Sequence, residues 1–372
     1  MQVITDAAIA AAPAYNEAEI RFHVLDPIIR LLGYPGADDV YLILEEKLEY
    51  PYQHIGRRSR KDLPAGRSDY RAGVKGARGS FVVEAKAGGV AITDREVEQA
   101  HSYAAHAQVG ANYFVLCNGS ALTVHETLSG PQATPLVELP LVEINARFHE
   151  VENILAPVNL VRNCRVEHDT KLKLAAGLGS SVRIRSGNYL LSDHDVRFMM
   201  NGQDITSLMR QNVPQIADMD RQLEMLKTVF EMRVSDGIVE RGADGKIGAH
   251  VEFTGATVPN HQAMAILGIN EASFVTADKF LSTDPESPTI CESVSDFTAS
   301  RGTMMPMFMG GAAPMGADVK GNMFIKVAMH YADGKFLGEY IAFSDQRFDI
   351  PGMLPMTIEM DMVGTFELLL DS

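Results

Sequence analysis

The sequence contains no tryptophan, only three cysteines, and fewer basic than acidic residues. Its cysteines, Cys117, Cys164 and Cys291, are widely spaced, which excludes a disulfide-rich framework and a zinc site built on paired cysteines. We expect them to be buried as small apolar side chains in a reducing compartment. No run of about 18 apolar residues is present, so the sequence predicts no membrane-spanning helix.

The N-terminal residues do not resemble a secretion signal. No basic region begins the chain and an acidic residue, Asp6, comes early, whereas a signal peptide starts with basic residues. We therefore expect a cytoplasmic protein without a membrane partner. A chain of 372 residues is long enough for two domains that each bury a core.

The net charge of −15 argues against a protein that coats nucleic acids by bulk electrostatic attraction. A local exception lies between residues 57 and 78, which hold eight basic and two acidic side chains. From this segment we expect Arg58, Arg60, Lys61 and Arg67 to bind the phosphates of a nucleic acid. The excess of acidic residues lies mostly in the second half of the chain.

The first 160 residues alternate between helical and strand-like patterns. A helix is expected from Asn16, which forms a capping-box pattern with Glu19, to Gly33, with a kink or break at Pro27. The further expected elements are strands over 40–50, 68–74 and 80–87, a helix from Thr93 to near Gly110, and two strands that meet at Asn118-Gly119. This order predicts an α/β domain with a mixed sheet flanked by helices.

Residues 161–372 are expected to form a second, β-rich α+β domain, whose role the sequence does not indicate. The pattern predicts short strands over 166–200, a helical segment over 203–233, and strands after Gly237 with turns at Asp244-Gly245 and Asp333-Gly334. The chain contains no GxxxxGK motif followed by serine or threonine, which excludes an ATPase motor that uses this phosphate-binding loop.

Three charged residues fall on the hairpin predicted over 68–87. Glu84 and Lys86 are two apart on one strand and therefore share a face, and the hairpin can bring Asp69 close to them. Two carboxylates and the main-chain carbonyl of Ala85 would form a hard-oxygen site that suits Mg²⁺ or Mn²⁺. Such an ion activates water and polarises a phosphate, and Lys86 would orient that water or stabilise the charge that develops.

The helix that follows the hairpin carries Gln99 and Tyr103, which are four apart and share a face. Together with the hairpin, five ordered blocks resemble the N-terminal nuclease domain of type I restriction enzyme R subunits, which belongs to the PD-(D/E)XK nuclease superfamily. The blocks are NEAEIRFHVLDPIIRLLGY, GRSDY, FVVEAKA, EQAHSYA and YFVLCNG. The resemblance covers roughly residues 15–160.

The resemblance implies a PD-(D/E)XK nuclease fold and a role for each matching residue. Asp69 and Glu84 correspond to the metal-binding carboxylates, and Lys86 corresponds to the catalytic lysine. Gln99 and Tyr103 correspond to the pair that supports the site and contacts DNA. The glutamate of the family's first helix corresponds best to Glu17, with Glu19 as the competing choice.

Two functions are consistent with these patterns. The first is Mg²⁺-dependent hydrolysis of DNA phosphodiester bonds in restriction or phage defence. It calls for specificity or targeting by the second domain or by a partner protein, and for a homodimer if both DNA strands are cut. The alternative is a non-catalytic nucleic-acid-binding or protein-binding module that retains the nuclease fold. The three charges crowded on one hairpin favour the enzyme, whereas the net charge of −15 and the missing motor favour the module.

Overall fold

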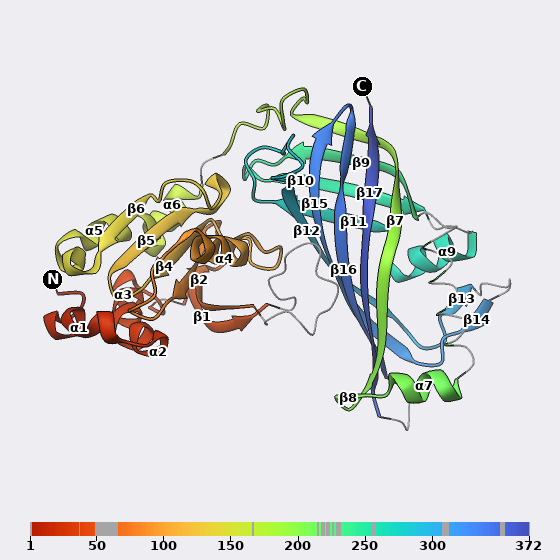
Figure 1. Ribbon diagram of the computed structural model, residues 1–372, viewed down its shortest axis with the longest axis horizontal. Helices are drawn as coiled ribbons and strands as arrows, with labels where there is room; N and C mark the ends of the chain where they lie inside the picture. Colours follow the sequence, from red (N-terminus) through yellow and green to blue (C-terminus); the bar gives the residue numbers. More distant parts are fainter. Residues whose placement is uncertain are drawn as a thin grey trace. The chain divides into compact units, whose positions relative to one another are not determined.

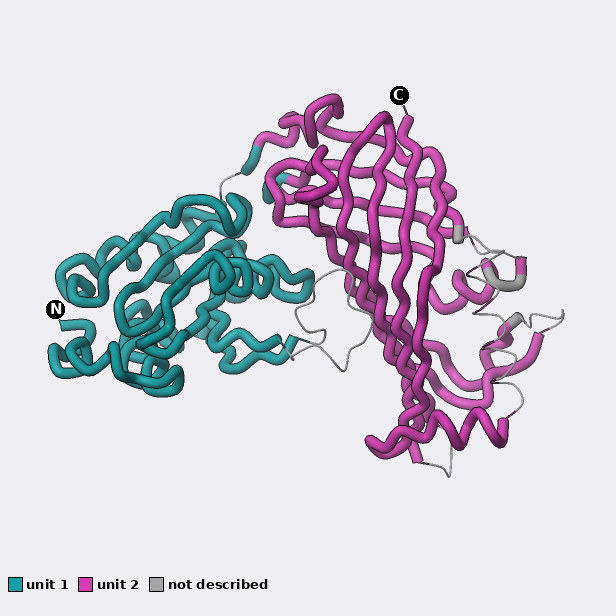
Figure 2. The backbone as a smooth tube through the Cα atoms, in the orientation of Figure 1, with its two compact units in different colours: residues 1–52, 64–168, 243–245 teal, residues 53–63, 169–242, 246–372 magenta. Residues whose placement is uncertain are grey.

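A computed structural model describes residues 2–36, 38–48, 66–165, 167–213, 216, 220, 224, 227, 232–254, 258–306, 312–349 and 354–371. The described residues form two compact units, shown in different colours in Figure 2. The first contains the described residues up to 168 together with 243–245, and the second contains the described residues of 169–242 and 246–371. The stretch with Arg58, Arg60 and Lys61 lies outside the described residues.

The first unit is an α/β structure. Its helices are α1 (Asp6–Ala11), α2 (Glu17–Ile20), the π-helical turn η2 (Arg21–Leu25), α3 (Asp26–Leu32), α4 (Asp94–Ala105), α5 (Ile144–Leu155) and α6 (Pro157–Asn163), with short 3-10 turns at Ala12–Ala14, Thr127–Ser129 and Leu141–Glu143. Its strands are β1 (Val40–Lys47), β2 (Arg67–Val74), β3 (Ser80–Ala85), β4 (Tyr113–Cys117), β5 (Ala121–Glu126) and β6 (Val137–Pro140).

These strands form one mixed sheet in the order β1-β2-β3-β4-β5-β6. Neighbouring strands are antiparallel except for β3 and β4, which are parallel and are connected through α4. The mixed sheet and the hairpin between β2 and β3 confirm the expected α/β class of the first half. The PD-(D/E)XK identity of this fold stays a prediction.

Helices cover both faces of the sheet, so β3 is buried along its whole length (Figure 1). Phe81 packs with α3, α5 and α6 on one face, whereas Val82 packs with Tyr103 of α4 on the other. Because side chains alternate along a strand, the even positions face α4. This alternation places Glu84, and Lys86 just beyond the strand, on the α4 side of the sheet.

The helix ends follow local signals in the sequence. Asn16 and Glu19 form the expected capping box, in which each side chain accepts a hydrogen bond of 2.9 Å from the other residue's backbone N–H. Gly33 ends α3 with a φ of 104°, a conformation that glycine adopts without strain. The irregularity expected at Pro27 is the π-helical turn just before it, and Pro27 itself lies in the first turn of α3.

Two expected boundaries in the first half differ from the structure. Helix α4 ends at Ala105 rather than near Gly110, because His106 has an extended backbone with ψ of 136° and a turn follows. The first compact unit extends beyond the boundary expected at residue 160, because α6 buries Leu160 and, just after it, Cys164 in the core.

The segment after β3 lies directly against the N-terminal segment. Gly88 donates a hydrogen bond of 2.8 Å from its backbone N–H to the carbonyl of Tyr15. A Cβ atom on Gly88 would overlap the carbonyl oxygen of Ala12, whereas a Cβ on Gly89 would meet no atom within 4 Å. This close approach holds α1 and α2 beside the end of β3, where Glu84 and Lys86 lie.

Replacing Gly88 with alanine should therefore destabilise the first unit by about 2 kcal/mol or more, because rigid backbone atoms must move apart. The matched control is Gly89→Ala, which introduces the same methyl group into open space. Thermal or urea unfolding of both variants measures the difference. Equal stability of the two variants would contradict the close packing of Gly88 on Ala12.

The second unit is a β-rich structure. Its strands are β7 (Ser181–Met200), β8 (Gln203–Asp204), β9 (Met232–Arg241), β10 (Ile247–Thr254), β11 (Glu271–Thr276), β12 (Thr289–Ala299), β15 (Asp318–Ala332), β16 (Lys335–Asp349) and β17 (Met356–Leu370), with a separate hairpin of β13 (Met304–Pro306) and β14 (Ala312–Pro314). Its described residues also form the helices α7 (Thr206–Asn212) and α9 (Val258–Leu267).

Eight of these strands close into an antiparallel barrel (Figure 1). Strand β17 pairs with β16 on one side and with β7 on the other, and β7 also pairs with β9. The strands β10, β11, β12 and β15 complete the circle from β9 to β16. The turns expected at Asp244-Gly245 and Asp333-Gly334 join β9 to β10 and β15 to β16.

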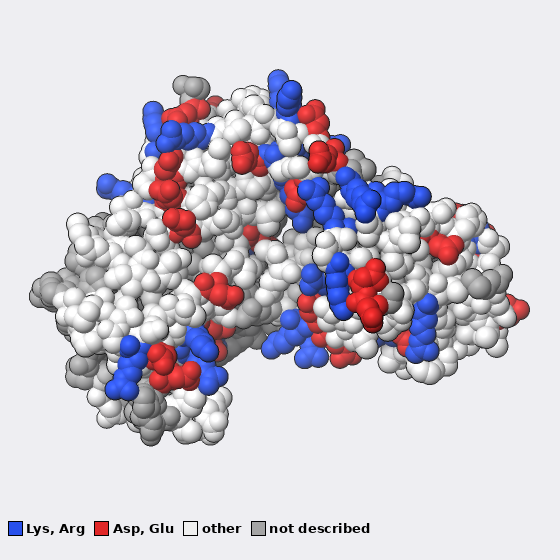
Figure 3. Space-filling model, turned by 180° about the vertical axis from the view of Figure 1, so that it is seen from behind, with Lys and Arg blue, Asp and Glu red and all other residues white. Residues whose placement is uncertain are grey.

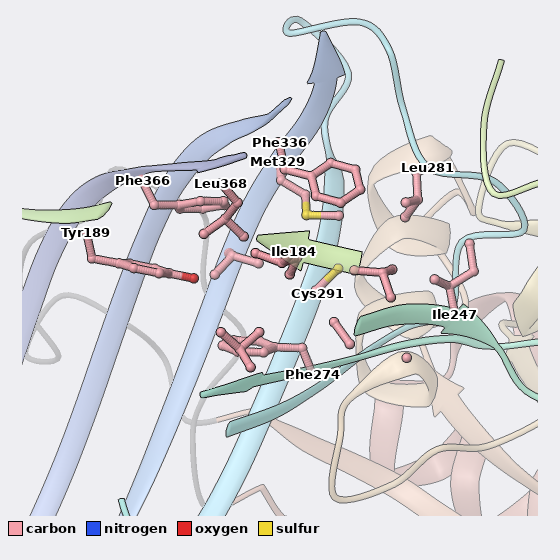
Figure 4. Close-up of a pocket in the computed structure, with 15 residues that line it drawn as sticks. Ile184, Tyr189, Ile247, Phe274, Leu281, Cys291, Met329, Phe336, Phe366 and Leu368 are labelled. Atoms are coloured by element: carbon pink, nitrogen blue, oxygen red, sulfur yellow. The ribbon is translucent and has the colours of Figure 1, made fainter. Parts of the chain in front are cut away.

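Apolar side chains fill the barrel interior. Figure 4 shows Ile184, Tyr189, Phe274, Phe336 and Phe366 pointing toward one another from β7, β11, β16 and β17. The cavity that remains between them and their neighbours is about 30 Å³, room for one or two water-sized molecules. These side chains therefore belong to a packed apolar core in this part of the barrel.

Two expectations for the second half need correction. The short strands expected over 166–200 are one strand of 20 residues, β7, because it pairs along its length with β17 and along its first half with β9. The helical segment expected over 203–233 contains α7, but Gln203–Asp204 form β8 and Met232 begins β9. Much of 214–231 lies outside the described residues. No helix in the described part of the chain is long and apolar enough to cross a membrane.

Candidate functional site

The hairpin of β2 and β3 brings Asp69 and Glu84 together. Tyr70 pairs with Val83 across the two strands, which puts the preceding Asp69 beside the following Glu84. The carboxylate of Asp69 accepts a hydrogen bond of 2.7 Å at Oδ2 from the backbone N–H of Ala85. Both acidic residues are buried, with exposed fractions of 8% for Asp69 and 6% for Glu84.

A chain of hydrogen bonds runs from Glu84 to helix α4. Lys86 donates from Nζ to Glu84 Oε1 at 2.8 Å and to Gln99 Oε1 at 3.0 Å. Gln99 in turn donates from Nε2 to the hydroxyl of Tyr103 at 2.8 Å. The structure thus brings the predicted lysine, glutamine and tyrosine into one connected array, which fixes the direction of the Lys86 ammonium.

Burial of the two carboxylates changes their pKa values. Desolvation is the main reason that the pKa of Glu84 is raised to about 7. The charge of Asp69 also raises this pKa, and the charge of the neighbouring Lys86 offsets only part of the increase. Burial also raises the pKa of Asp69, against the hydrogen bond from Ala85 and the charge of Arg21, which lower it. Two buried carboxylates with raised pKa values form a site that gains from a cation.

Glu17 and Glu19, the two candidates on the first helix, have different surroundings. The carboxylate of Glu19 is used in the capping box with Asn16. Glu17 is exposed at the start of α2, and its charge contributes to raising the pKa values of both Asp69 and Glu84. Electrostatics therefore links Glu17, rather than Glu19, to the buried carboxylates.

The donor set fits a hard divalent cation. Glu84 Oε2 is buried and has no hydrogen-bond partner among the described residues, so one of its oxygens is left to bind a ligand. Asp69 and the main-chain carbonyl of Ala85 supply the other oxygens on the same edge. No group of three or more His, Cys, Asp or Glu side chains with metal-site spacing occurs in the described ranges. Mg²⁺ does not require one, because it binds through one or two carboxylates, water and substrate phosphates.

Arg67 is the one predicted phosphate-binding residue within the described residues. Its side chain is 56% exposed and its Nη1 lies 3.9 Å from Glu45 Oε2. On the face drawn in Figure 3, the described basic side chains lie in small groups beside acidic ones, without a broad basic surface among them. Phosphate binding at this site would therefore depend on a few local side chains.

Arg21 and Glu45 belong to the site but were not predicted from the sequence. Arg21 Nη1 lies 2.8 Å from Glu45 Oε1 and 3.3 Å from Asp69 Oδ1. The spacing of Glu17 and Arg21, four apart on one helix, is the signal that could have identified Arg21. The position of Glu45 is determined by the pairing of β1 with β2, which the sequence alone does not specify.

Comparison with known proteins does not place the chain in a family. No protein-family model matches the sequence, and no curated protein is significantly similar to it.

Proposed function

We propose that this protein is a divalent-metal-dependent nuclease that hydrolyses DNA phosphodiester bonds, in restriction or phage defence. The observation that carries the proposal is the buried pair Asp69 and Glu84, in which Glu84 Oε2 has no hydrogen-bond partner among the described residues and Lys86 is held beside it. Burying carboxylates without full pairing is costly, so an ordinary hairpin gains nothing from this arrangement. A metal-binding catalytic site, in contrast, gains from this arrangement.

Each residue of the site has a chemical task in this proposal. Asp69, Glu84 and the carbonyl of Ala85 would hold Mg²⁺ or Mn²⁺, which polarises a phosphate and lowers the pKa of a bound water. Lys86 would donate a hydrogen bond to the attacking water or to the phosphate as negative charge develops. Gln99 holds the Lys86 ammonium in place, and Tyr103 in turn holds Gln99.

The choice of DNA as substrate rests on the resemblance and on the basic stretch that leads into β2. Arg67 is exposed and lies two residues before Asp69 on β2, so its side chain would be available to a phosphate backbone bound at the site. Nucleic-acid specificity would come from the second unit or from a partner protein, since the face drawn in Figure 3 has no broad basic surface among its described residues.

The decisive experiment measures cleavage of supercoiled plasmid and of single-stranded DNA by the purified protein with Mg²⁺ or Mn²⁺. We expect metal-dependent nicking that Asp69→Ala reduces by about 100-fold or more. The exposed Asp39→Ala is a matched control that should cleave like the wild type. Cleavage that persists in Asp69→Ala would show that the site around Asp69 is not the nuclease site.

The alternative is a non-catalytic nucleic-acid-binding or protein-binding module, which the net charge of −15 favours. Absence of cleavage together with absence of metal binding would support this module. Metal binding without cleavage would instead point to a missing partner or activating signal.

A further inference from the structure

Arg21 lies between two carboxylates of different exposure. Its Nη1 atom contacts both Glu45 Oε1, at 2.8 Å, and Asp69 Oδ1, at 3.3 Å. The guanidinium carbon also lies 5.5 Å from the centroid of the Tyr70 ring, a cation–π distance. The side chain of Asp69 is 10% exposed and that of Glu45 is 52% exposed, so Arg21 joins a buried anion to one at the surface.

The contact with Asp69 involves the oxygen that a metal would use. Oδ2 of Asp69 already accepts the hydrogen bond from the backbone N–H of Ala85. Oδ1 is the oxygen left for a cation, and Arg21 contacts that same atom. A divalent ion bound to Asp69 and the guanidinium of Arg21 would therefore compete for one oxygen.

The backbone of Glu45 is unusual in a way that supports its contact with Arg21. Glu45 has a φ of 49°, whereas the other described non-glycine residues with positive φ, Asn201 and Asp333, each precede a glycine in a turn. Glu45 instead lies within strand β1, where this conformation costs about 1–3 kcal/mol. The strained position brings its carboxylate to Arg21, and such strain is typical of functional sites.

We propose that Arg21 is a resident counter-cation of Asp69 that a divalent ion must displace, and that Glu45 is the carboxylate that retains Arg21 when it leaves. This inference rests on the proposed metal site. In the metal-free protein, Arg21 compensates the buried charge of Asp69. On metal binding, the guanidinium keeps its shorter contact with Glu45 and gives up Asp69. The Arg21–Glu45 pair therefore sets the metal affinity of the site without being part of the metal-binding set.

The test is a titration of the full-length protein with Mn²⁺ in the absence of DNA, for example by calorimetry. Arg21→Met removes the competing cation and should tighten Mn²⁺ binding about fivefold or more. Glu45→Gln leaves Arg21 with Asp69 alone and should weaken binding about threefold or more. The Glu45 side chain is 52% exposed, so the variant should fold.

The double variant separates this mechanism from a general charge effect. With Arg21→Met already present, Glu45→Gln should change the Mn²⁺ affinity less than twofold, because no arginine remains to be redirected. The matched control is Arg71 with Glu46, an ion pair of 2.9 Å between β2 and β1, the strands that carry Asp69 and Glu45. Arg71→Met and Glu46→Gln should each leave the affinity within about twofold of the wild type, because these two side chains pair with each other rather than with Asp69.

The outcomes distinguish this inference from the proposed function. Unchanged or weaker Mn²⁺ binding by Arg21→Met, with wild-type binding intact, would overturn the counter-cation role and leave the metal site standing. An equal loss of Mn²⁺ affinity from Glu45→Gln in the wild type and in the Arg21→Met background would also overturn the counter-cation role. No Mn²⁺ binding by either the wild type or Arg21→Met would remove the metal site itself, and the proposed function with it.

Discussion

Replacing Lys86 with alanine should slow DNA cleavage by about 100- to 1000-fold, the usual cost of removing one donor that stabilises charge in a transition state. The side chain lies at the centre of the site, with its ammonium between Glu84 and Gln99. The substitution removes no apolar core contact, so the fold should persist. DNA affinity measured with Ca²⁺ in place of Mg²⁺ should stay within about threefold, because metal and backbone contacts remain.

The matched control for this variant is Lys75→Ala. Lys75 follows β2 in the same hairpin, but its ammonium contacts the carbonyl of Asp38 and no site residue. Single-turnover cleavage rates of the two variants and the wild type, with circular dichroism to check folding, give the comparison. Full activity in Lys86→Ala would show that this lysine is not catalytic.

Replacing Glu84 with glutamine should stabilise the metal-free protein at pH 8 by up to about 3 kcal/mol, since each unit of pKa shift corresponds to about 1.4 kcal/mol and burial raises the pKa of Glu84 from 4.5 to about 7. Because the folded state binds this proton more tightly than the unfolded state, the wild type loses stability as the pH rises from about 4.5 to 7. Below about pH 4.5 the carboxyl is protonated in both states and the advantage of the variant disappears.

The measurement is thermal unfolding from pH 5 to pH 8 in the presence of a chelator, where the variant should gain several degrees at the upper end only. Glutamine can still accept the hydrogen bond from Lys86, so packing at the site is preserved. The exposed Glu138→Gln serves as the control and should not change the pH profile. A difference between Glu84→Gln and wild type that is the same at pH 5 and pH 8 would contradict the raised pKa.

The core of the site could be predicted because its geometry is local. Asp69 and Glu84 lie on adjacent strands of a short hairpin, and the alternation of side chains along β3 places Lys86 on the same face as Glu84. Gln99 and Tyr103 follow on the next helix at a spacing that shares one face. These relations depend on a few neighbouring residues and on no long-range contact.

Arg21 and Glu45 could not be placed in the same way. Their contact joins a helix to a strand that lies 24 residues further along the chain. The position of Glu45 also depends on a backbone φ of 49°. Glycine or asparagine in the sequence would indicate a positive φ, but a glutamate does not. Tertiary packing and strand register determine both residues.

The second unit was predictable as β-rich but not as a barrel. The glycines within 166–200 indicate turns between short strands, but Gly187 is paired on both sides within β7. The length of β7 is explained by its pairing with β17, the last strand of the unit. Such a pairing between distant segments leaves no pattern within either strand.

The closure of the barrel by β7 and β17 also bears on the order in which the protein folds during synthesis. All elements of the first unit up to α6 are synthesised before β7, and they pack into cores on the two faces of their sheet without the barrel strands. The barrel cannot close until Met356–Leu370 has been translated, because only then do the open edges of β7 and β16 both find a partner. On the nascent chain, the site around Asp69 would therefore be assembled while the second unit still exposes unpaired strand edges, which chaperones would have to shield.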